Sequence, residues 1–412
     1  MKSESSTPWQ ATSGVRVALY SHDTMGLGHT RRNLLIAETL ARSELAADVL
    51  LISGARHASR FELPRGVDCV TLPALAKEAD GAYGPRTLRM GLDDLRSLRS
   101  ATIDATLRAF EPDVFVVDNV PRGALDELLP TLSRLREGGR TRCVLGLRDV
   151  LDDPAVVARE WRDRDTERTI EDLFDAVWVY GDPTVYDVAA ACAFPGSVRA
   201  KLEYVGYLDA GERMTHAISP EACHPGVVLG TVGGGQDGVR LAEAFVRAEA
   251  PQGVDRVLIT GPDMPTAAFE RVLAHASTRP DLTVLGFDPE PTRWLRHASR
   301  VVTMGGYNAV TEVLAFETPA LIVPRVRPRR EQWIRARSLA RLGLVDVLHP
   351  GRLTPDALSS WLASPPARPN ARGRVDLNGL ERIPPRVAAL LTTAPTRSID
   401  MSRGWCEPAP LS

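Results

Sequence analysis

Two glycine-rich segments in the second half of the chain have the form of phosphate-binding turns. Residues 231–238 read TVGGGQDG and residues 303–312 read TMGGYNAVTE, and each belongs to the end of a short apolar run. Glycines allow backbone N–H groups to approach a phosphate closely, and the N-terminus of a following helix adds partial positive charge. A tight turn without a ligand would look similar, and neither segment is a P-loop because no Gly-Lys-Ser/Thr follows. Two such turns in one domain favour nucleotide binding.

The second of these turns also offers a side chain for a ribose. Asn308 is a good N-cap for the helix expected after the glycines, and Glu312 lies about one turn further on. A carboxylate at that position can accept two hydrogen bonds from a ribose diol while the helix N-terminus faces a diphosphate. The alternative is that Glu312 only complements the positive end of the helix dipole.

A third glycine-containing turn follows the first apolar run of the chain. Residues 22–31 read HDTMGLGHTR, which predicts a strand end, a turn and a helix with His29 near its start. A histidine with a pKa near neutrality is a natural general base for an acceptor hydroxyl or amine, although an isolated histidine more often caps or packs. We expect His29 to be the base, with His22 as an alternative, and His22 and Gly28 to contact the acceptor.

Two more strand ends in the first half carry polar pairs, Asp118-Asn119 and Arg148-Asp149. In parallel sheets ligands bind outside the carboxyl ends of the strands, so both pairs are expected near His29. Asp118 or Asp149 is expected to orient His29 or to replace it as the base. Asn119 is expected to contact the acceptor and Arg148 to bind an acidic group on it. Alternatively, Arg148 and Asp149 simply pair with their neighbours.

The sequence pattern around these residues predicts the alternating strands and helices of parallel α/β structure. Short apolar runs alternate with amphipathic stretches from end to end, which is the pattern of βαβ units. The longest helix is expected from about residue 87 to 110, with a further helix at 384–391. The expected strands are 15–22, 48–53, 67–72, 114–118, 143–148 and 176–181, then 227–231, 256–260, 282–286, 300–304, 320–324 and 344–348.

The length of 412 residues, with 44% hydrophobic content, suits two domains of ordinary size. The alternation of apolar runs and amphipathic stretches stops after residue 209 and resumes near residue 226, which indicates a linker. The expected division is a disordered N-terminus at 1–14, a first domain at 15–209, a linker at 210–225, a second domain at 226–370, a C-terminal helical segment at 371–391 that packs back on the first domain, and a tail at 392–412.

Composition excludes several classes of function. The formal net charge of -2 provides no basic field for nucleic acid. The five cysteines show no zinc-ligand or CxxC spacing, which argues against a zinc site and fits a reducing cytoplasm. Residues 1–14 are polar and do not resemble a signal peptide, and no apolar run approaches the roughly 18 residues of a spanning helix. At most peripheral membrane contact is expected, and nothing indicates the oligomeric state.

The three glycine-containing segments, in their order and spacing, resemble those of the GT-B glycosyltransferases, especially glycosyltransferase family 28. The best-known member of that family transfers N-acetylglucosamine from UDP-N-acetylglucosamine to the lipid-linked peptidoglycan precursor. The resemblance is most specific at TMGGYNAVTEVLAFETPALIVPRV, residues 303–326, followed by Glu331-Gln332. It implies an α/β GT-B fold, with two Rossmann-like domains facing a central cleft.

The resemblance also implies a role for each matching residue in binding the donor. The family's Gly-Gly-Ser-Gln-Gly loop is changed here at two positions, and its Gly-Gly-His followed shortly by Pro is replaced by Gly-Leu-Gly-His-Thr-Arg-Arg, so the acceptor class is open. The implied positions are Gly305, Gly306 and Asn308 at the diphosphate, Glu312 at the ribose, Glu331 and Gln332 at the sugar, Gly234, Gly235 and Gln236 in the first loop, Phe287 over the base, and His29 as the base catalyst.

Transferases of this fold generally need no metal, because helix dipoles and backbone N–H groups stabilise the departing diphosphate. The Asp163-Arg-Asp165 sequence lies in a charged helical stretch, so we expect neither a metal site nor any other cofactor. The resulting expectation is an inverting, metal-independent transfer from a nucleotide-sugar, such as UDP-N-acetylglucosamine, to a small-molecule or natural-product acceptor. The alternatives are a nucleotide-sugar 2-epimerase on the same fold and a non-catalytic nucleotide-sugar-binding subunit.

Overall fold

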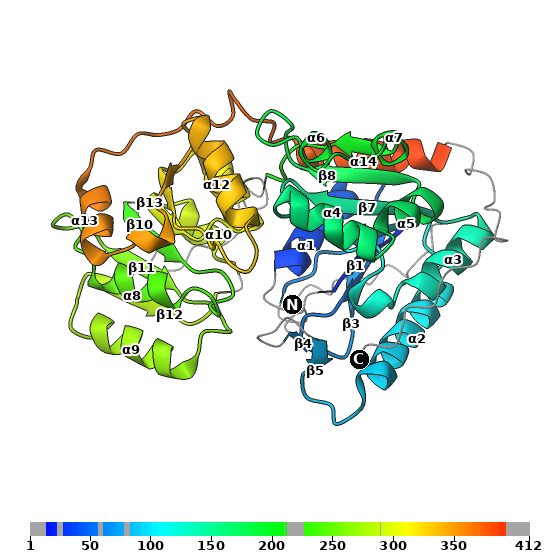
Figure 1. The fold of residues 1–412 in the computed structure, drawn as a ribbon, viewed down its shortest axis with the longest axis horizontal. Coiled ribbons are helices and arrows are strands. Elements are labelled where there is room, and N and C mark those ends of the chain that lie inside the picture. The colour runs from blue at the N-terminus through cyan, green and yellow to red at the C-terminus, as the bar shows by residue number, and fades with distance from the viewer. Residues whose placement is uncertain are drawn as a thin grey trace, which may run out of the picture.

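The computed structural model of the chain describes residues 14–22, 28–56, 61–77, 83–209, 211, 226–288 and 290–392. Two parallel β-sheets lie side by side, each with helices on both faces (Figure 1). The α/β expectation is therefore confirmed. The expected linker at 210–225 and the two termini fall almost entirely outside the described residues. No helix within the described ranges is both long and apolar enough to cross a membrane.

The first sheet has seven parallel strands in the order β3-β2-β1-β6-β7-β8-β9. Its central strands are buried except at Arg16 and Arg148, as expected for near-continuous apolar runs covered on both faces. Its strands and main helices are β1 (Arg16–Ser21), α1 (Gly28–Arg42), β2 (Asp48–Ser53), β3 (Val67–Thr71), α2 (Leu92–Phe110), β6 (Val114–Asp118), α3 (Leu129–Gly138), β7 (Arg142–Arg148), α4 (Pro154–Asp163), α5 (Thr166–Leu173), β8 (Ala176–Tyr180), α6 (Val188–Ala191), α7 (Gly196–Arg199) and β9 (Leu202–Tyr204).

The second sheet has six parallel strands in the order β12-β11-β10-β13-β14-β15. Both glycine-rich turns leave this sheet from adjacent strands, β10 and β13, whose last residues are in register. Its elements are β10 (Val227–Thr231), α8 (Val239–Arg247), β11 (Arg256–Ile259), α9 (Thr266–Ala276), β12 (Leu282–Leu285), α10 (Thr292–Leu295), β13 (Ala298–Thr303), α11 (Tyr307–Phe316), β14 (Ala320–Ile322), α12 (Glu331–Arg341), β15 (Asp346–Val347) and α13 (Pro355–Ala363).

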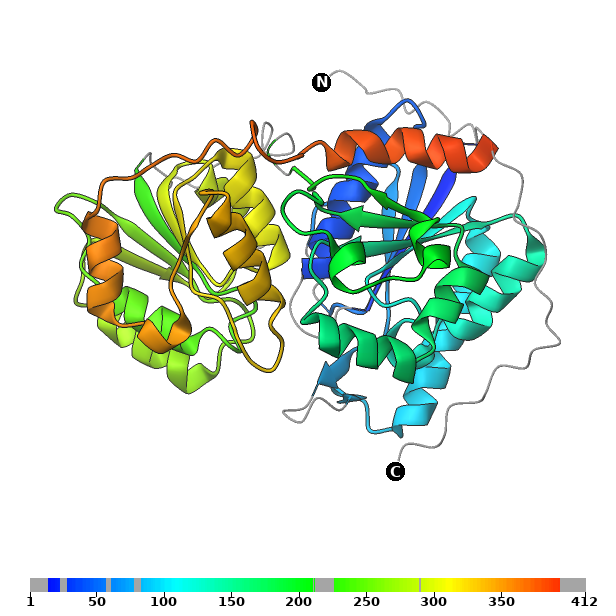
Figure 2. The same cartoon turned by 45° about the horizontal axis from the view of Figure 1, so that its top comes forward.

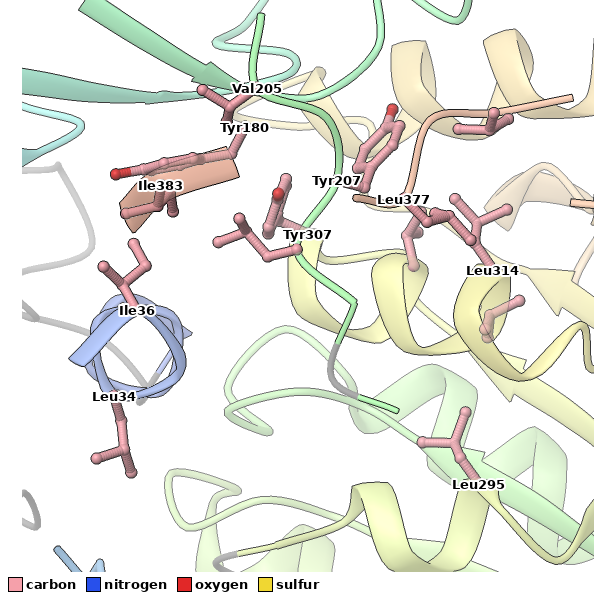
Figure 3. Packing of buried hydrophobic residues seen from close by; sticks show 14 of the residues in the cluster. Leu34, Ile36, Tyr180, Val205, Tyr207, Leu295, Tyr307, Leu314, Leu377 and Ile383 are labelled. Atoms are coloured by element: carbon pink, nitrogen blue, oxygen red, sulfur yellow. The ribbon is translucent and has the colours of Figure 1, made fainter. Parts of the chain in front are cut away.

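The C-terminal helix α14 (Gly379–Thr392) returns to the first domain and packs against α1 (Figure 2). Ile36 of α1 and Ile383 of α14 are fully buried and point toward one another (Figure 3). A helix was expected from about residue 384 to 391, within the segment 371–391. It begins at Gly379, inside that segment but before residue 384, and keeps Pro384 and Pro385 in its interior, since packing of the buried apolar face outweighs the proline penalty.

One further expectation needs correction, and one element was not anticipated. The long helix α2 begins at residue 92 rather than about 87, because Gly91 adopts an extended N-cap conformation and Asp93 and Asp94 occupy the first turn. A two-stranded antiparallel sheet, β4 (Leu75–Lys77) with β5 (Tyr83–Pro85), was not expected. Neither difference affects the strand ends at which the site residues were predicted.

Candidate functional site

The two glycine-rich turns of the second domain meet at the ends of β10 and β13. Thr231 and Thr303, at the strand ends, share a hydrogen bond between their hydroxyls at 3.0 Å. Gly305 has φ +76°, and a Cβ there would lie 2.5 Å from the Ile322 side chain. A Cβ at Gly306 would meet no atom of the described residues within 4 Å. The backbone at Gly306 is thus open to a ligand, whereas Gly305 is required by the fold itself.

The first turn carries Gly234, Gly235 and Gln236 between β10 and α8. Gly235 has φ +97°, and a Cβ there would lie 2.3 Å from the Thr260 carbonyl oxygen, so this position also requires glycine for the turn. Asp237, where the family has glycine, binds Arg325 at 2.7 Å. The departure from the family loop is therefore matched by an arginine from the segment after β14.

Asn308 is not the N-cap of α11. The helix begins at Tyr307, and Gly306 is the N-cap with extended backbone angles. Asn308 instead donates a hydrogen bond from Nδ2 to the carbonyl oxygen of Gly28 at 2.9 Å, across to the first residue of α1. This contact brings the N-terminus of α1 and the N-terminus of α11 together.

Glu312 lies on α11 and is 3% exposed. Its Oε1 accepts from Arg31 Nη2 at 2.6 Å and from the Thr292 hydroxyl at 3.0 Å. Arg31 belongs to α1, so this ion pair crosses between the domains, and Arg31 also lies 3.3 Å from Glu290. Burial raises the pKa of the Glu312 carboxyl, with Arg31 opposing the shift. Glu312 thus does more than complement its own helix dipole.

Glu331 and Gln332 begin α12 and both contact Arg325. Glu331 Oε1 accepts from the Arg325 guanidinium at 2.6 Å, and Gln332 Oε1 accepts from the Arg325 backbone N–H at 2.9 Å. Glu331 Oε2 is buried without a hydrogen-bond partner among the described residues. Phe287 lies in the loop after β12 and is partly buried. Contacts of these residues with a donor sugar or base remain predictions.

In the first domain, His29 is held by a buried carboxylate. Its Nδ1 lies 2.7 Å from Asp118 Oδ2, and both Asp118 oxygens accept from Arg32 Nη2 at 2.6 Å. Although burial alone would raise it, Arg32 and His29 hold the pKa of the Asp118 carboxyl well below its ordinary value. Arg32 Nη2 also lies 3.0 Å from His29 Nδ1, so Asp118 and Arg32 both hold this nitrogen. Because an ionised carboxylate only accepts, a proton on Nδ1 would satisfy Asp118 and leave Nε2 as the basic nitrogen.

His22 follows β1 and lies beside His29, with ring centroids 4.8 Å apart. Its Nδ1 is buried without a hydrogen-bond partner among the described residues. Burial, and then the neighbouring His29, lower the pKa of His22 well below its ordinary value. His22 is therefore a neutral ring against His29.

Arg148 and Asn119 come together as predicted from their strand ends. Arg148 Nε donates to Asn119 Oδ1 at 3.3 Å. Asp149, by contrast, does not orient His29 in this structure: Arg335 of α12 binds it at 2.6 Å, and the Tyr207 hydroxyl donates to it at 3.0 Å. The alternative that Asp149 pairs with a neighbour is the arrangement seen.

Several arginines that join the domains were not anticipated. Arg31, which pairs with Glu312, lies two residues after His29, and Arg335, which pairs with Asp149, lies one turn after Glu331. Arg329 and Arg330 also cross to the first domain, where they bind Asp152 at 3.0 Å and Asp153 at 2.8 Å. The only signal in the sequence is the Arg-Arg pair that departs from the family motif.

The described residues contain no group of three or more His, Cys, Asp or Glu side chains able to hold a metal ion. Asp163 ends α4 and Asp165 is the N-cap of α5, so the two lie on either side of a break between helices. The Asp163-Arg-Asp165 sequence was expected within a single helical stretch, and the left-handed backbone of Asp165 causes the break.

Comparisons with known proteins match this architecture. Residues 230–365 match the glycosyltransferase family 28 C-terminal domain. The calicheamicin glycosyltransferase CalG4 superposes with a TM-score of 0.59 at 16% identity, covering 92% of this chain and 99% of its own. MurG of Acinetobacter baumannii gives 0.56 at 15%, covering 91% and 99%. Glycosyltransferase VinC, in complex with DTDP, gives 0.57 at 16%, covering 92% and 98%. No curated protein sequence matches the chain.

The two parallel sheets and these neighbours define the fold as GT-B. The second domain carries the match to the family 28 C-terminal domain, which confirms the resemblance inferred from TMGGYNAVTE and the residues after it. Together these findings support a transferase, a glycosyltransferase of the GT-B type.

Proposed function

We propose that the chain transfers a sugar from a nucleoside-diphosphate sugar to a hydroxyl or amine of a small-molecule acceptor, with inversion at the anomeric carbon and without a metal. The observation that carries this proposal is the 2.9 Å hydrogen bond from Asn308 to Gly28. This bond places the N-terminus of α1, which carries His29, next to the N-terminus of α11, where Gly306 is the N-cap. A base and a diphosphate-binding turn are thereby neighbours across the two domains.

In this mechanism His29 Nε2 takes the proton of the attacking hydroxyl or amine. Asp118, kept ionised by Arg32, stabilises the imidazolium that results. The Gly306 backbone and the N-terminus of α11 stabilise the negative charge that develops on the departing diphosphate, which makes a bound metal unnecessary. Attack from the face opposite the diphosphate inverts the anomeric centre.

The donor is proposed to be linked to UDP or to dTDP. UDP, for example in UDP-N-acetylglucosamine, follows from the resemblance to family 28, and the similar structure of VinC contains DTDP. The proposed acceptor is a natural product or another small molecule, because CalG4 is a calicheamicin glycosyltransferase and the His29 turn departs from the family pattern.

The test begins with nucleotide binding. Calorimetry with UDP, dTDP, GDP and their sugars is expected to identify a binder, and transfer is then measured against an acceptor panel. His29→Ala should keep donor affinity and lose transfer by about a hundredfold or more. His275→Ala, on the exposed surface of α9, is the matched control. An epimerised donor without acceptor, or full transfer activity in His29→Ala, would contradict the proposal.

A further inference from the structure

Arg148 stands at the carboxyl end of β7 as a cation without a carboxylate partner among the residues that the structure describes. Its Nε is held by Asn119 at 3.3 Å, and no hydrogen bond to a described residue uses either Nη group. The side chain is only partly buried, so the Nη groups are within reach of a ligand.

The charged groups around Arg148 are already matched to one another. These pairs are Arg32 with Asp118, Arg335 with Asp149 and Arg325 with Glu331, each at 2.6 Å. Each of these three carboxylates is bound by an arginine other than Arg148, and Arg325 also binds Asp237 at 2.7 Å, so no described carboxylate forms an ion pair with Arg148. A partly buried charge of this kind is costly until an anion pairs with it.

The pKa values of the neighbouring arginines follow the same pattern. Burial, followed by repulsion from Arg32 and Arg335, lowers the pKa of Arg148 to about 10, despite the opposing influence of Glu331. Asp118 raises the pKa of Arg32 against the effect of burial, and Asp149 does so for Arg335. Among these three arginines, only Arg148 has a lowered pKa, as expected for a guanidinium that no carboxylate binds.

The position of Arg148 assigns that counterion to the acceptor rather than to the donor diphosphate. Its partner Asn119 directly follows Asp118, which holds His29, whereas the open Gly306 backbone lies on the second domain. A guanidinium with two Nη groups available favours bidentate binding of a planar carboxylate. A molecule whose carboxylate is bound by Arg148 then presents its hydroxyl or amine toward His29.

We propose that Arg148 binds a carboxylate of the acceptor, so that the enzyme glycosylates acidic molecules. This inference rests on the proposed transferase function and names its substrate class.

The test uses pairs of acceptors that differ only in charge. Phenolic acids and hydroxy acids, each beside its methyl ester, are glycosylated from the nucleotide-sugar that binds the wild type. The acids should be preferred about tenfold or more in kcat/KM, and Arg148→Met should abolish this preference with an unchanged KM for the donor. Arg148→Lys, which keeps the charge but not the paired donors, should retain part of it. Arg108→Met, an exposed arginine of α2, is the control.

Equal rates for acids and esters in the wild type, or a preference that survives in Arg148→Met, would overturn this inference and leave the transferase proposal standing. A raised donor KM in Arg148→Met with the acid preference intact would place Arg148 on the diphosphate, and would overturn it as well. Absence of nucleotide binding would overturn the proposed function and this inference with it.

Discussion

Arg31 Nη2 lies 2.6 Å from Oε1 of Glu312, so the carboxylate expected to bind the donor ribose is already paired with an arginine of the other domain. Arg31 is two residues after His29 on α1. The ion pair therefore couples the helix of the proposed base to the helix of the proposed donor site. A ribose that uses Glu312 must share its carboxylate with Arg31 or displace that arginine.

The strength of this coupling can be measured by a double-mutant cycle of Arg31→Met and Glu312→Gln. Both side chains are largely buried, so the interaction free energy should be about 1–3 kcal/mol. The control cycle is Arg42 with Glu38, a pair on α1 whose arginine is 58% exposed, which should give less than about 0.5 kcal/mol. The measurement is thermal unfolding, and additive effects of the first pair would show that it does not couple the domains.

Two adjacent glycines separate a structural role from a binding role. Gly305→Ala should destabilise the second domain by about 1–3 kcal/mol, because the backbone is left-handed and the added Cβ would meet Ile322. Gly306→Ala should leave the melting temperature unchanged, because its backbone suits any residue and no described residue lies within 4 Å of the added Cβ. If the diphosphate approaches Gly306, the added methyl group should weaken nucleotide binding about tenfold. Unchanged binding in Gly306→Ala would remove this residue from the donor site.

Much of the fold could be predicted because strands buried on both faces read as continuous apolar runs, as at residues 114–118 and 227–231. β9 (Leu202–Tyr204) was missed because its short sequence, LEY, places a glutamate between two half-buried residues. The start of α14 was missed because Ile383 and Val387 are buried against the first domain, and tertiary packing of this kind leaves no local signal.

The candidate site was predictable where a residue ends a strand. His29, Asp118, Asn119 and Arg148 came together because parallel strands share one carboxyl edge. The partners of Asp149 and Glu312 were not predictable, because both are bound by arginines from the opposite domain. Forty-seven arginines in the chain give no indication of which ones cross.

Asp118 and Asp149 offer a comparison between a carboxylate at the base and one that only joins the domains. Asp118→Asn and Asp149→Asn should each cost about 3 kcal/mol of stability at neutral pH, because each leaves a buried arginine unpaired. Only Asp118→Asn should also reduce kcat in the folded enzyme, by about a hundredfold or more, because it removes the charge opposite the His29 imidazolium. An equal loss of kcat in both variants would count against His29 as the base.

The stability difference between wild type and Asp118→Asn also has a defined pH dependence. The folded pKa of Asp118 lies below its ordinary value of 3.8, so the carboxylate stabilises the fold above that pH. The contribution is lost as the pH falls through the lowered folded value. Melting temperatures should therefore differ by a constant amount from pH 7 to about pH 5 and converge only in stronger acid. Convergence already at pH 6 would show that Asp118 is not held ionised by Arg32.

Arg148 should reveal its missing counterion through the stability of the ligand-free protein. Arg148→Met removes a charge that burial and two neighbouring arginines disfavour, so it should raise the free energy of unfolding by about 1 kcal/mol. Arg32→Met should instead lower the free energy of unfolding by about 3 kcal/mol, because it leaves Asp118 buried without its arginine. Chemical denaturation of both variants measures whether each substitution raises or lowers the free energy of unfolding. A loss of stability in Arg148→Met would mean that Arg148 supports the fold, whereas a gain together with a lost preference for acidic acceptors would mark it as a residue kept for binding.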